Sequence, residues 1–173
     1  MRVVGGNFRG RRIEAPNSQD VRPTSDRVRE AIFNMLFSLG LPAGCSVADI
    51  FAGSGALGIE ALSRGAASAV FIDSSREACV AIEKNLESLG AEAKIVRGDC
   101  LREMPSKNVD LVFADPPYGF EAWEQLLDCA TDSIWVIESN RSIGPFTGWE
   151  TVRSRRYGRA FITILRAPEE NNS

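Results

Sequence analysis

The chain has 173 residues, of which 44% are hydrophobic and 25% charged, the balance of an ordinary soluble globular protein. This length is too short for a dinucleotide-binding domain plus a separate substrate domain. No apolar run approaches the roughly 20 residues that cross a bilayer, and the start MRVVGGNFRG lacks the apolar core of a signal peptide, so we expect a cytoplasmic protein with no membrane partner. The chain has no histidine, which excludes Ser-His-Asp and Cys-His mechanisms and His-ligated metals, and no metal site is expected.

The amino-terminal residues are basic, although the whole chain carries a net charge of −3. Residues 1–29 hold seven arginines against three acids, a local net charge of +4, and the rest of the chain sums to −7. The stretch VVGGNFRGRRIEA predicts a small glycine-broken hairpin, and we assign residues 1–20 to a basic arm and residues 21–173 to the main domain. A solvated face is the simpler interpretation of any one arginine, but the cluster favours a phosphate-binding surface.

The rest of the sequence predicts an α/β fold. Apolar residues recur at helical spacing in DRVREAIFNMLFSLG and indicate a front helix, capped by Thr24 or Ser25. Short apolar runs then alternate with helical stretches, which implies a parallel sheet covered by helices. The expected strands lie near residues 46–50, 69–72, 94–96, 109–114, 133–138, 150–155 and 160–165, and the expected helices near 56–64, 75–89 and 121–130.

The last two strands are separated by only a few residues around Tyr157 and Gly158. This is too short for a crossover helix, so we expect an antiparallel hairpin. The prediction is therefore a Rossmann-like, seven-stranded sheet that is mostly parallel, with an antiparallel carboxyl-terminal hairpin.

A glycine-rich turn follows the first expected strand, in DIFAGSGALG. Gly53, Gly55 and Gly58 have the spacing G-x-G-x-x-G, and Asp73 follows Gly53 by twenty residues, as in dinucleotide-binding dehydrogenases. Asp49 argues against a dinucleotide, because two unit charges about 4 Å apart interact by about 4 kcal/mol near a protein surface and a carboxylate would repel the pyrophosphate. S-adenosylmethionine has a cationic sulfonium and an ammonium group and no phosphate, so its charge suits this site.

Two further acids follow expected strands. Asp73 is placed to accept hydrogen bonds from ribose hydroxyls, and Asp99, in RGDC, offers a carboxylate to an adenine amino group. The alternative for each acid is a strand-end turn or a helix cap. Acids after three successive strands favour a ligand site, because doubly wound sheets bind their ligands at the carboxyl ends of the strands.

The most specific stretch is Asp115-Pro116-Pro117-Tyr118, after the fourth expected strand. The prolines restrict the backbone and remove two N–H groups, which leaves a rigid loop rich in hydrogen-bond acceptors. Such a loop suits the amino group of a nucleobase and can orient its nitrogen toward a methyl donor, while Tyr118 offers a face for a base turned out of its helix. The alternative is a proline turn that merely ends a strand. Nothing in composition or spacing selects guanine over adenine.

In this order, DIFAGSGALG, the acid of FIDSS, GDC and DPPY resemble the class I S-adenosylmethionine-dependent methyltransferases that modify exocyclic amino groups. With VVGGNFRGRRI and RPTSDRVREAIFNML, nearly the whole chain resembles the bacterial small-subunit ribosomal RNA guanine-N2 methyltransferases of the RsmD type. The resemblance implies methylation of N2 of one guanine in 16S rRNA, presented on the small ribosomal subunit or an assembly intermediate, and we expect a monomer.

The resemblance also assigns site residues. It implies cofactor contacts for Asp49, Gly53, Gly55, Asp73, Asp99 and Cys100, target-base contacts for Asp115, Pro116 and Tyr118, and RNA contacts for Arg2, Arg9, Arg11, Arg12, Arg22, Thr24 and Arg27. The arginines of the last hairpin, Arg153, Arg155, Arg156 and Arg159, either contact phosphates or cover a sheet edge. The alternatives are an adenine-N6 methyltransferase acting on DNA or RNA, a non-catalytic RNA-binding assembly factor with the same fold, and, more distantly, a dehydrogenase.

Overall fold

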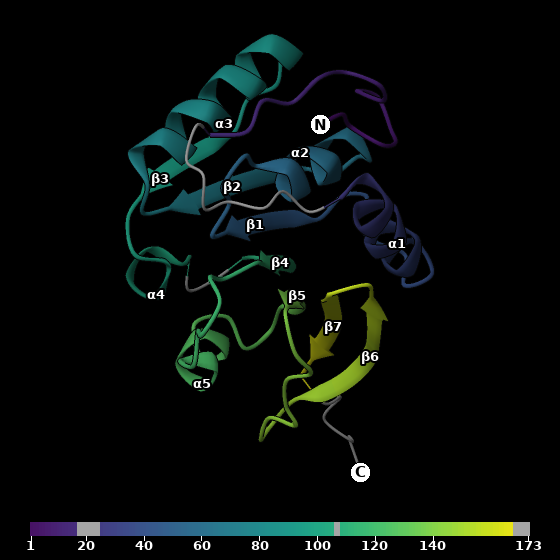
Figure 1. The fold of residues 1–173 in the computed structure, drawn as a ribbon, viewed down its shortest axis with the longest axis vertical. Helices are drawn as coiled ribbons and strands as arrows, with labels where there is room; N and C mark the ends of the chain where they lie inside the picture. The colour runs from purple at the N-terminus through teal and green to yellow at the C-terminus, as the bar shows by residue number, and fades with distance from the viewer. Residues whose placement is uncertain (17–24, 106–107, 168–173) are drawn as a thin grey trace.

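A computed structural model describes residues 1–16, 25–105 and 108–167 (Figure 1). Its centre is a seven-stranded sheet in the order β3-β2-β1-β4-β5-β7-β6. The strands are β1 (Ser46–Ile50), β2 (Ser68–Asp73), β3 (Lys94–Arg97), β4 (Leu111–Ala114), β5 (Ile134–Ser139), β6 (Glu150–Tyr157) and β7 (Ala160–Arg166). Strands β1 to β5 pair in parallel, and β7 is antiparallel to both β5 and β6. The predicted sheet and its carboxyl-terminal hairpin are confirmed.

The helices cover both faces of this sheet. They are α1 (Asp26–Phe37), α2 (Ala56–Ser63), α3 (Arg76–Leu89), α4 (Cys100–Glu103) and α5 (Trp123–Leu127). Successive residues of β1 show the two faces, because Val47 joins the apolar core under α1, α2 and α3, and Ala48 joins the core under α4 and α5. Figure 1 shows α4 and α5 near one another, apart from α1 and α2. No helix in the described part of the chain is long and apolar enough to span a membrane.

Local capping explains where the main helices begin and end. Ser25 accepts a hydrogen bond from the Val28 N–H at 3.3 Å and starts α1, while the alternative cap, Thr24, lies outside the described residues. Ser75 caps α3, and Gly90, with φ of +65°, ends it as predicted. Two details differ from the prediction: α4 was not expected, and α5 is shorter than residues 121–130.

The amino-terminal hairpin forms and is packed on the body of the protein. Arg2 and Arg12 form an antiparallel bridge, and the neighbouring Val3 and Ile13 are buried in the main core. Figure 1 shows the amino terminus beside α2. The boundary expected between residues 20 and 21 lies outside the described residues.

The hairpin is fixed to α2 by a buried carboxylate. Glu60 has no exposed surface and accepts hydrogen bonds from the Val4 and Gly5 N–H groups at 2.8 and 2.7 Å, while the Arg64 guanidinium donates to it at 2.8 Å. At Gly6, with φ of +73°, an added Cβ would lie 1.9 Å from the Ser63 carbonyl oxygen. Gly5 and Gly6 therefore permit close approach of the hairpin to the helix.

Candidate active site

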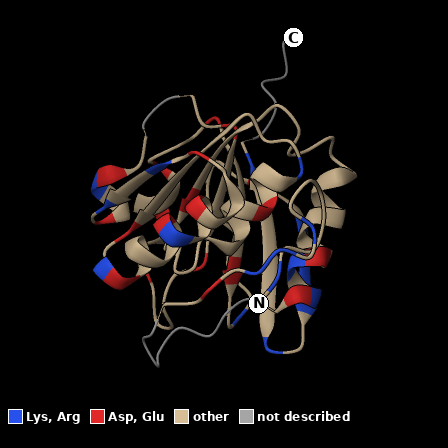
Figure 2. Cartoon of the chain, turned by 90° about the horizontal axis from the view of Figure 1, so that it is seen from above, with Lys and Arg blue, Asp and Glu red and all other residues tan. Residues whose placement is uncertain are grey.

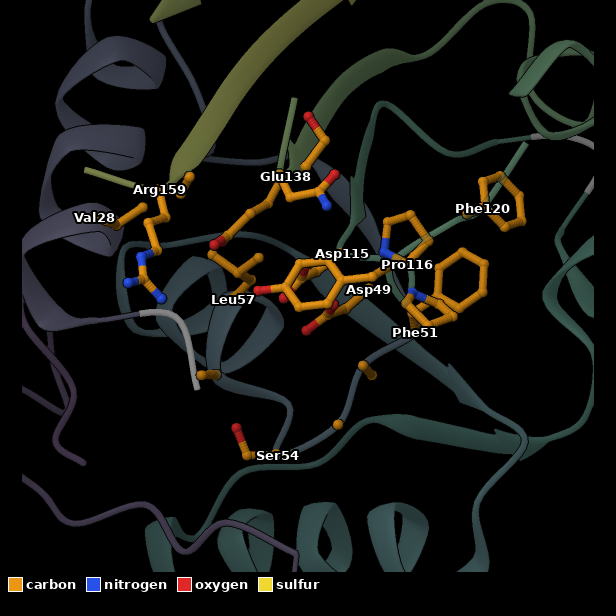
Figure 3. Close-up of a pocket in the computed structure, with 18 of the residues that line it drawn as sticks. Val28, Asp49, Phe51, Ser54, Leu57, Asp115, Pro116, Phe120, Glu138 and Arg159 are labelled. Atoms are coloured by element: carbon orange, nitrogen blue, oxygen red, sulfur yellow. The ribbon is translucent and has the colours of Figure 1, made fainter. Parts of the chain in front are cut away.

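A cavity of about 760 Å³ opens at the carboxyl ends of β1, β2, β4 and β5. Four acids line it, one from the end of each of these strands: Asp49, Asp73, Asp115 and Glu138. Its size is within the range of about 300 to 1,000 Å³ that is usual for small-molecule sites. Figure 3 shows Asp49, Asp115 and Glu138 near the centre of the cavity, with Arg159 on one side and Phe51 and Phe120 on the other.

The strand register explains why these acids meet. Asp49 pairs with Phe71 on β2 and with Phe113 on β4. Two positions after these partners, Asp73 ends β2 and Asp115 directly follows β4. Side chains two residues apart share one face of a sheet, so these acids lie on the face of Asp49. Parallel topology therefore brings together three of the acids singled out in the sequence.

Asp49 is 3% exposed, and its Oδ2 accepts a hydrogen bond from the Gly58 N–H at 2.8 Å. An added Cβ at Gly58 would lie 2.4 Å from the Phe71 ring, so glycine lets α2 approach this carboxylate. Burial raises the pKa of Asp49 to about 8, against the lowering effect of the Gly58 hydrogen bond and with a further rise from Asp73. The raised pKa makes the charge of Asp49 sensitive to its surroundings, and a neighbouring cation would favour the ionised form that the sequence analysis expects.

Asp73 holds the glycine loop in place. Its Oδ2 accepts from the Gly53 N–H and its Oδ1 from the Ser75 N–H, both at 2.8 Å. Gly53 lines the cavity beside it. Gly55 is not among the lining residues; its φ of +74° and the close packing of Ile82 and Phe71 against it give it a conformational role.

Asp99 and Cys100 are not among the residues that line the cavity. Asp99 is exposed and accepts from the Leu101 N–H at 3.0 Å, which makes it the N-cap of α4. This geometry corresponds to the helix-cap alternative considered for Asp99. Cys100 is buried, and burial raises the pKa of its thiol to about 11. Cofactor contacts for both residues remain a prediction.

The DPPY loop forms one wall of the cavity. Asp115 is half-buried, Pro116 is buried, and Tyr118 is 75% exposed; all three line the cavity. Burial raises the pKa of Asp115 well above its ordinary value, and the adjacent Glu138 and then Asp49 raise it further. The loop therefore presents a carboxyl group whose protonation depends on what enters the cavity.

An aromatic cluster supports this loop. Phe120 contacts Phe51 edge-on with ring centres 5.4 Å apart, and Trp123 edge-on at 4.8 Å. Phe51 has φ of +57°, an uncommon conformation for a non-glycine residue. All three side chains line the cavity. This cluster was not predicted from the sequence, because Phe51 comes from a segment far from Phe120 and Trp123.

Glu138 is a further cavity residue that was not predicted from the sequence. The available signal was the same one that singled out the other acids, since the fifth strand, IWVIES, has an acid as its second-last residue. Arg141 and Arg159 also line the cavity and are exposed. Arg159 belongs to the turn between β6 and β7, which places one of the four hairpin arginines at the cavity.

The expected RNA-binding arginines lie elsewhere. Arg2, Arg9, Arg11, Arg12 and Arg27 are exposed, and none of them lines the cavity. Arg2 donates to the Gly10 carbonyl at 2.7 Å, and Arg11 to the Ser88 carbonyl at 2.5 Å. Figure 2 shows blue residues along the amino-terminal segment, and both blue and red residues over the body. Arg22 and Thr24 lie outside the described residues.

The fold and the cavity define a methyltransferase: a doubly wound sheet with a glycine loop after β1, an acid after β2 and an acceptor-rich loop after β4. The family model described as conserved hypothetical protein 95 matches residues 1–166, and the chain belongs to this family, together with relatives named ribosomal RNA small subunit methyltransferase D.

Relatives of this chain match it in sequence and in structure. The chain is 40% identical over 141 residues to ribosomal RNA small subunit methyltransferase D of Escherichia coli, covering 80% of this chain and 70% of the relative. It is 35% identical to the protein of that name from Haemophilus influenzae, covering 79% and 73%. The solved structure of Escherichia coli yhhF, named as a methyltransferase, superposes with a TM-score of 0.82 at 32% identity, covering 96% and 97%. The predicted family and enzyme class are confirmed, and the dehydrogenase alternative is not supported.

Proposed function

We propose that the protein transfers a methyl group from S-adenosylmethionine to the N2 amine of one guanine in 16S rRNA, within the small ribosomal subunit or an assembly intermediate. The observation that carries this proposal is the meeting of Asp115 and Pro116 with Asp49 and the glycine loop in one cavity. The names of the similar proteins support an rRNA substrate. We further propose that the protein acts as a monomer in the cytoplasm.

The cofactor would occupy the part of the cavity formed by the ends of β1 and β2. Gly53 brings backbone to the cavity surface without a side chain, and Asp73 offers acceptors to ribose hydroxyls. Asp49 would be ionised by the positive charge of the ligand, because a nearby cation lowers the pKa of a carboxyl group. When bound, S-adenosylmethionine supplies an electrophilic methyl group.

The target base would lie against the DPPY loop. The Asp115 carboxylate and the carbonyl groups of the loop accept hydrogen bonds from the amine and hold its nitrogen toward the methyl donor. Tyr118 projects to solvent at the cavity and is placed to stack on a base turned out of its helix, an interaction of about 1 to 3 kcal/mol. No histidine is needed, because positioning supplies most of the catalysis.

RNA phosphates would be held at two places. Arg141 and Arg159 flank the cavity, where they can contact the nucleotides next to the target. Arg9, Arg12 and Arg27 are exposed on the hairpin and α1 and would contact more distant phosphates. Arg22 and Thr24 belong to the same proposal through the resemblance alone.

The test is a methylation assay with labelled S-adenosylmethionine and small subunits that lack the modification. We expect one N2-methylguanosine per particle, identified by mass spectrometry of the nucleosides. Label on adenine, or on DNA in preference to the particle, would contradict the substrate assignment. Absence of any transfer would favour the non-catalytic assembly factor.

A further inference from the structure

Glu138 is a cavity acid that neither the glycine loop nor the DPPY motif contains. β4 and β5 pair in parallel with Ala114 opposite Ile137, so Asp115, which directly follows β4, and Glu138, the next residue of β5, lie side by side. Adjacent strands are about 4.8 Å apart, which gives neighbouring positions to the two carboxyl groups. Both line the cavity, and Figure 3 shows them close together.

Two adjacent carboxyl groups at a half-buried site disfavour each other's ionisation. The effect is visible in Asp115, whose pKa is raised by burial and then by Glu138. A ligand with two neighbouring N–H donors can donate one hydrogen bond to each carboxyl group. The pair therefore suits a base edge with adjacent donors.

The two candidate bases differ at this edge. Guanine presents its N2 amine next to the N1–H, so both groups donate, whereas adenine presents its amine next to an unprotonated N1 that accepts. An ionised carboxylate only accepts hydrogen bonds. It therefore attracts the N1–H of guanine and repels the N1 lone pair of adenine.

Resting on the proposed function, we propose that Glu138 is the residue that selects guanine, by accepting a hydrogen bond from N1–H while Asp115 and the loop carbonyls hold the N2 amine. In this assignment, Asp115 at the end of β4 positions the reacting amine, and Glu138 on β5 recognises the N1–H group beside it. A site that accepts a hydrogen bond from one N–H group rejects an analogue that lacks this donor, because the analogue cannot form that bond.

The test compares guanine with 2-aminopurine at the target nucleotide of a reconstituted small subunit. 2-Aminopurine keeps the amine at position 2 and lacks the N1–H. We expect the wild-type protein to methylate guanine at least about 100-fold faster in single turnover. Equal rates on the two bases would show that N1–H is not read and would overturn the proposal without any variant.

The variant Glu138→Gln sharpens the assignment, because its amide has the same shape and adds a donor that suits an unprotonated N1. We expect its preference for guanine over 2-aminopurine to fall to within about tenfold, through a lower rate on guanine, with S-adenosylhomocysteine binding unchanged. Glu150→Gln, an exposed acid paired with Arg166 outside the cavity, should keep the wild-type preference.

A Glu138→Gln protein that keeps the wild-type preference would overturn the proposal and leave the methyltransferase assignment intact. Failure of the wild-type protein to methylate guanine would instead contradict the proposed function itself. The two failures are therefore distinguishable in one experiment.

Discussion

The cavity and the amino-terminal hairpin are both dense in charge, and they are built in different ways. The cavity acids come from the ends of β1, β2, β4 and β5 and meet because parallel strands end at one edge. The hairpin arginines are neighbours in sequence, and their position depends on backbone groups docked on the buried Glu60. Topology thus places the acids around one cavity, whereas docking holds the arginines on the outside of the molecule.

The largest effect is expected at Asp115 on the cavity side of this comparison. Asp115→Ala removes the acceptor from the proposed amine site and should lower single-turnover methylation by about 1,000-fold or more. The fold should persist, so S-adenosylhomocysteine affinity and the thermal midpoint serve as controls. Methylation within tenfold of wild type would show that the DPPY carboxylate does not hold the amine.

On the hairpin side, Glu60→Ala should destabilise the protein by about 3 kcal/mol. It leaves two backbone N–H groups and the Arg64 guanidinium without their buried acceptor. Denaturant unfolding measures this loss. The matched control is Glu150→Ala, which breaks an exposed ion pair and should cost less than about 1 kcal/mol. Equal losses would mean that Glu60 does not anchor the hairpin.

The pKa of Asp49, about 8, predicts a pH dependence of cofactor binding. The ionised carboxyl attracts the cationic ligand, and this form increases as pH rises toward 8, so S-adenosylmethionine affinity should rise by up to about tenfold per unit between pH 6 and 8. Calorimetry at several pH values checks this expectation. Asp49→Asn should remove the dependence, and an unchanged slope in that variant would assign it to another group.

The smallest effects are expected for single arginines. Arg159→Ala, at the cavity, should reduce methylation several-fold more than Arg9→Ala on the hairpin, because its proposed phosphate is next to the target nucleotide. Each change should lower the slope of log affinity against log salt by about 1. A larger effect of Arg9→Ala than of Arg159→Ala would indicate that the main RNA-binding surface lies on the hairpin.

Much of this organisation was predictable from the sequence. Strand periodicity and the caps at Ser25, Ser75 and Gly90 depend on local residues, and the parallel order then implied where Asp49, Asp73 and Asp115 would meet. The hairpin partner was not predictable, because Glu60 lies in an apolar helix and its bonds to Val4 and Gly5 span more than fifty residues.

The site could be predicted only in part for a similar reason. Glu138 ends a strand like the other acids, but no named motif surrounds it, and its pairing with Asp115 depends on the register of β4 and β5. The raised pKa of Asp49 could not be predicted either, because its burial follows from the packing of α2 and cannot be seen in the sequence.

A crystal structure of the protein with sinefungin tests the central claim most directly. The account predicts the ligand in the cavity, with its ribose at Asp73, its amine on the side of Asp49, and open space left against Asp115 and Glu138 for a base. A ligand bound elsewhere, or Asp49 and Asp115 turned out of the cavity, would contradict it.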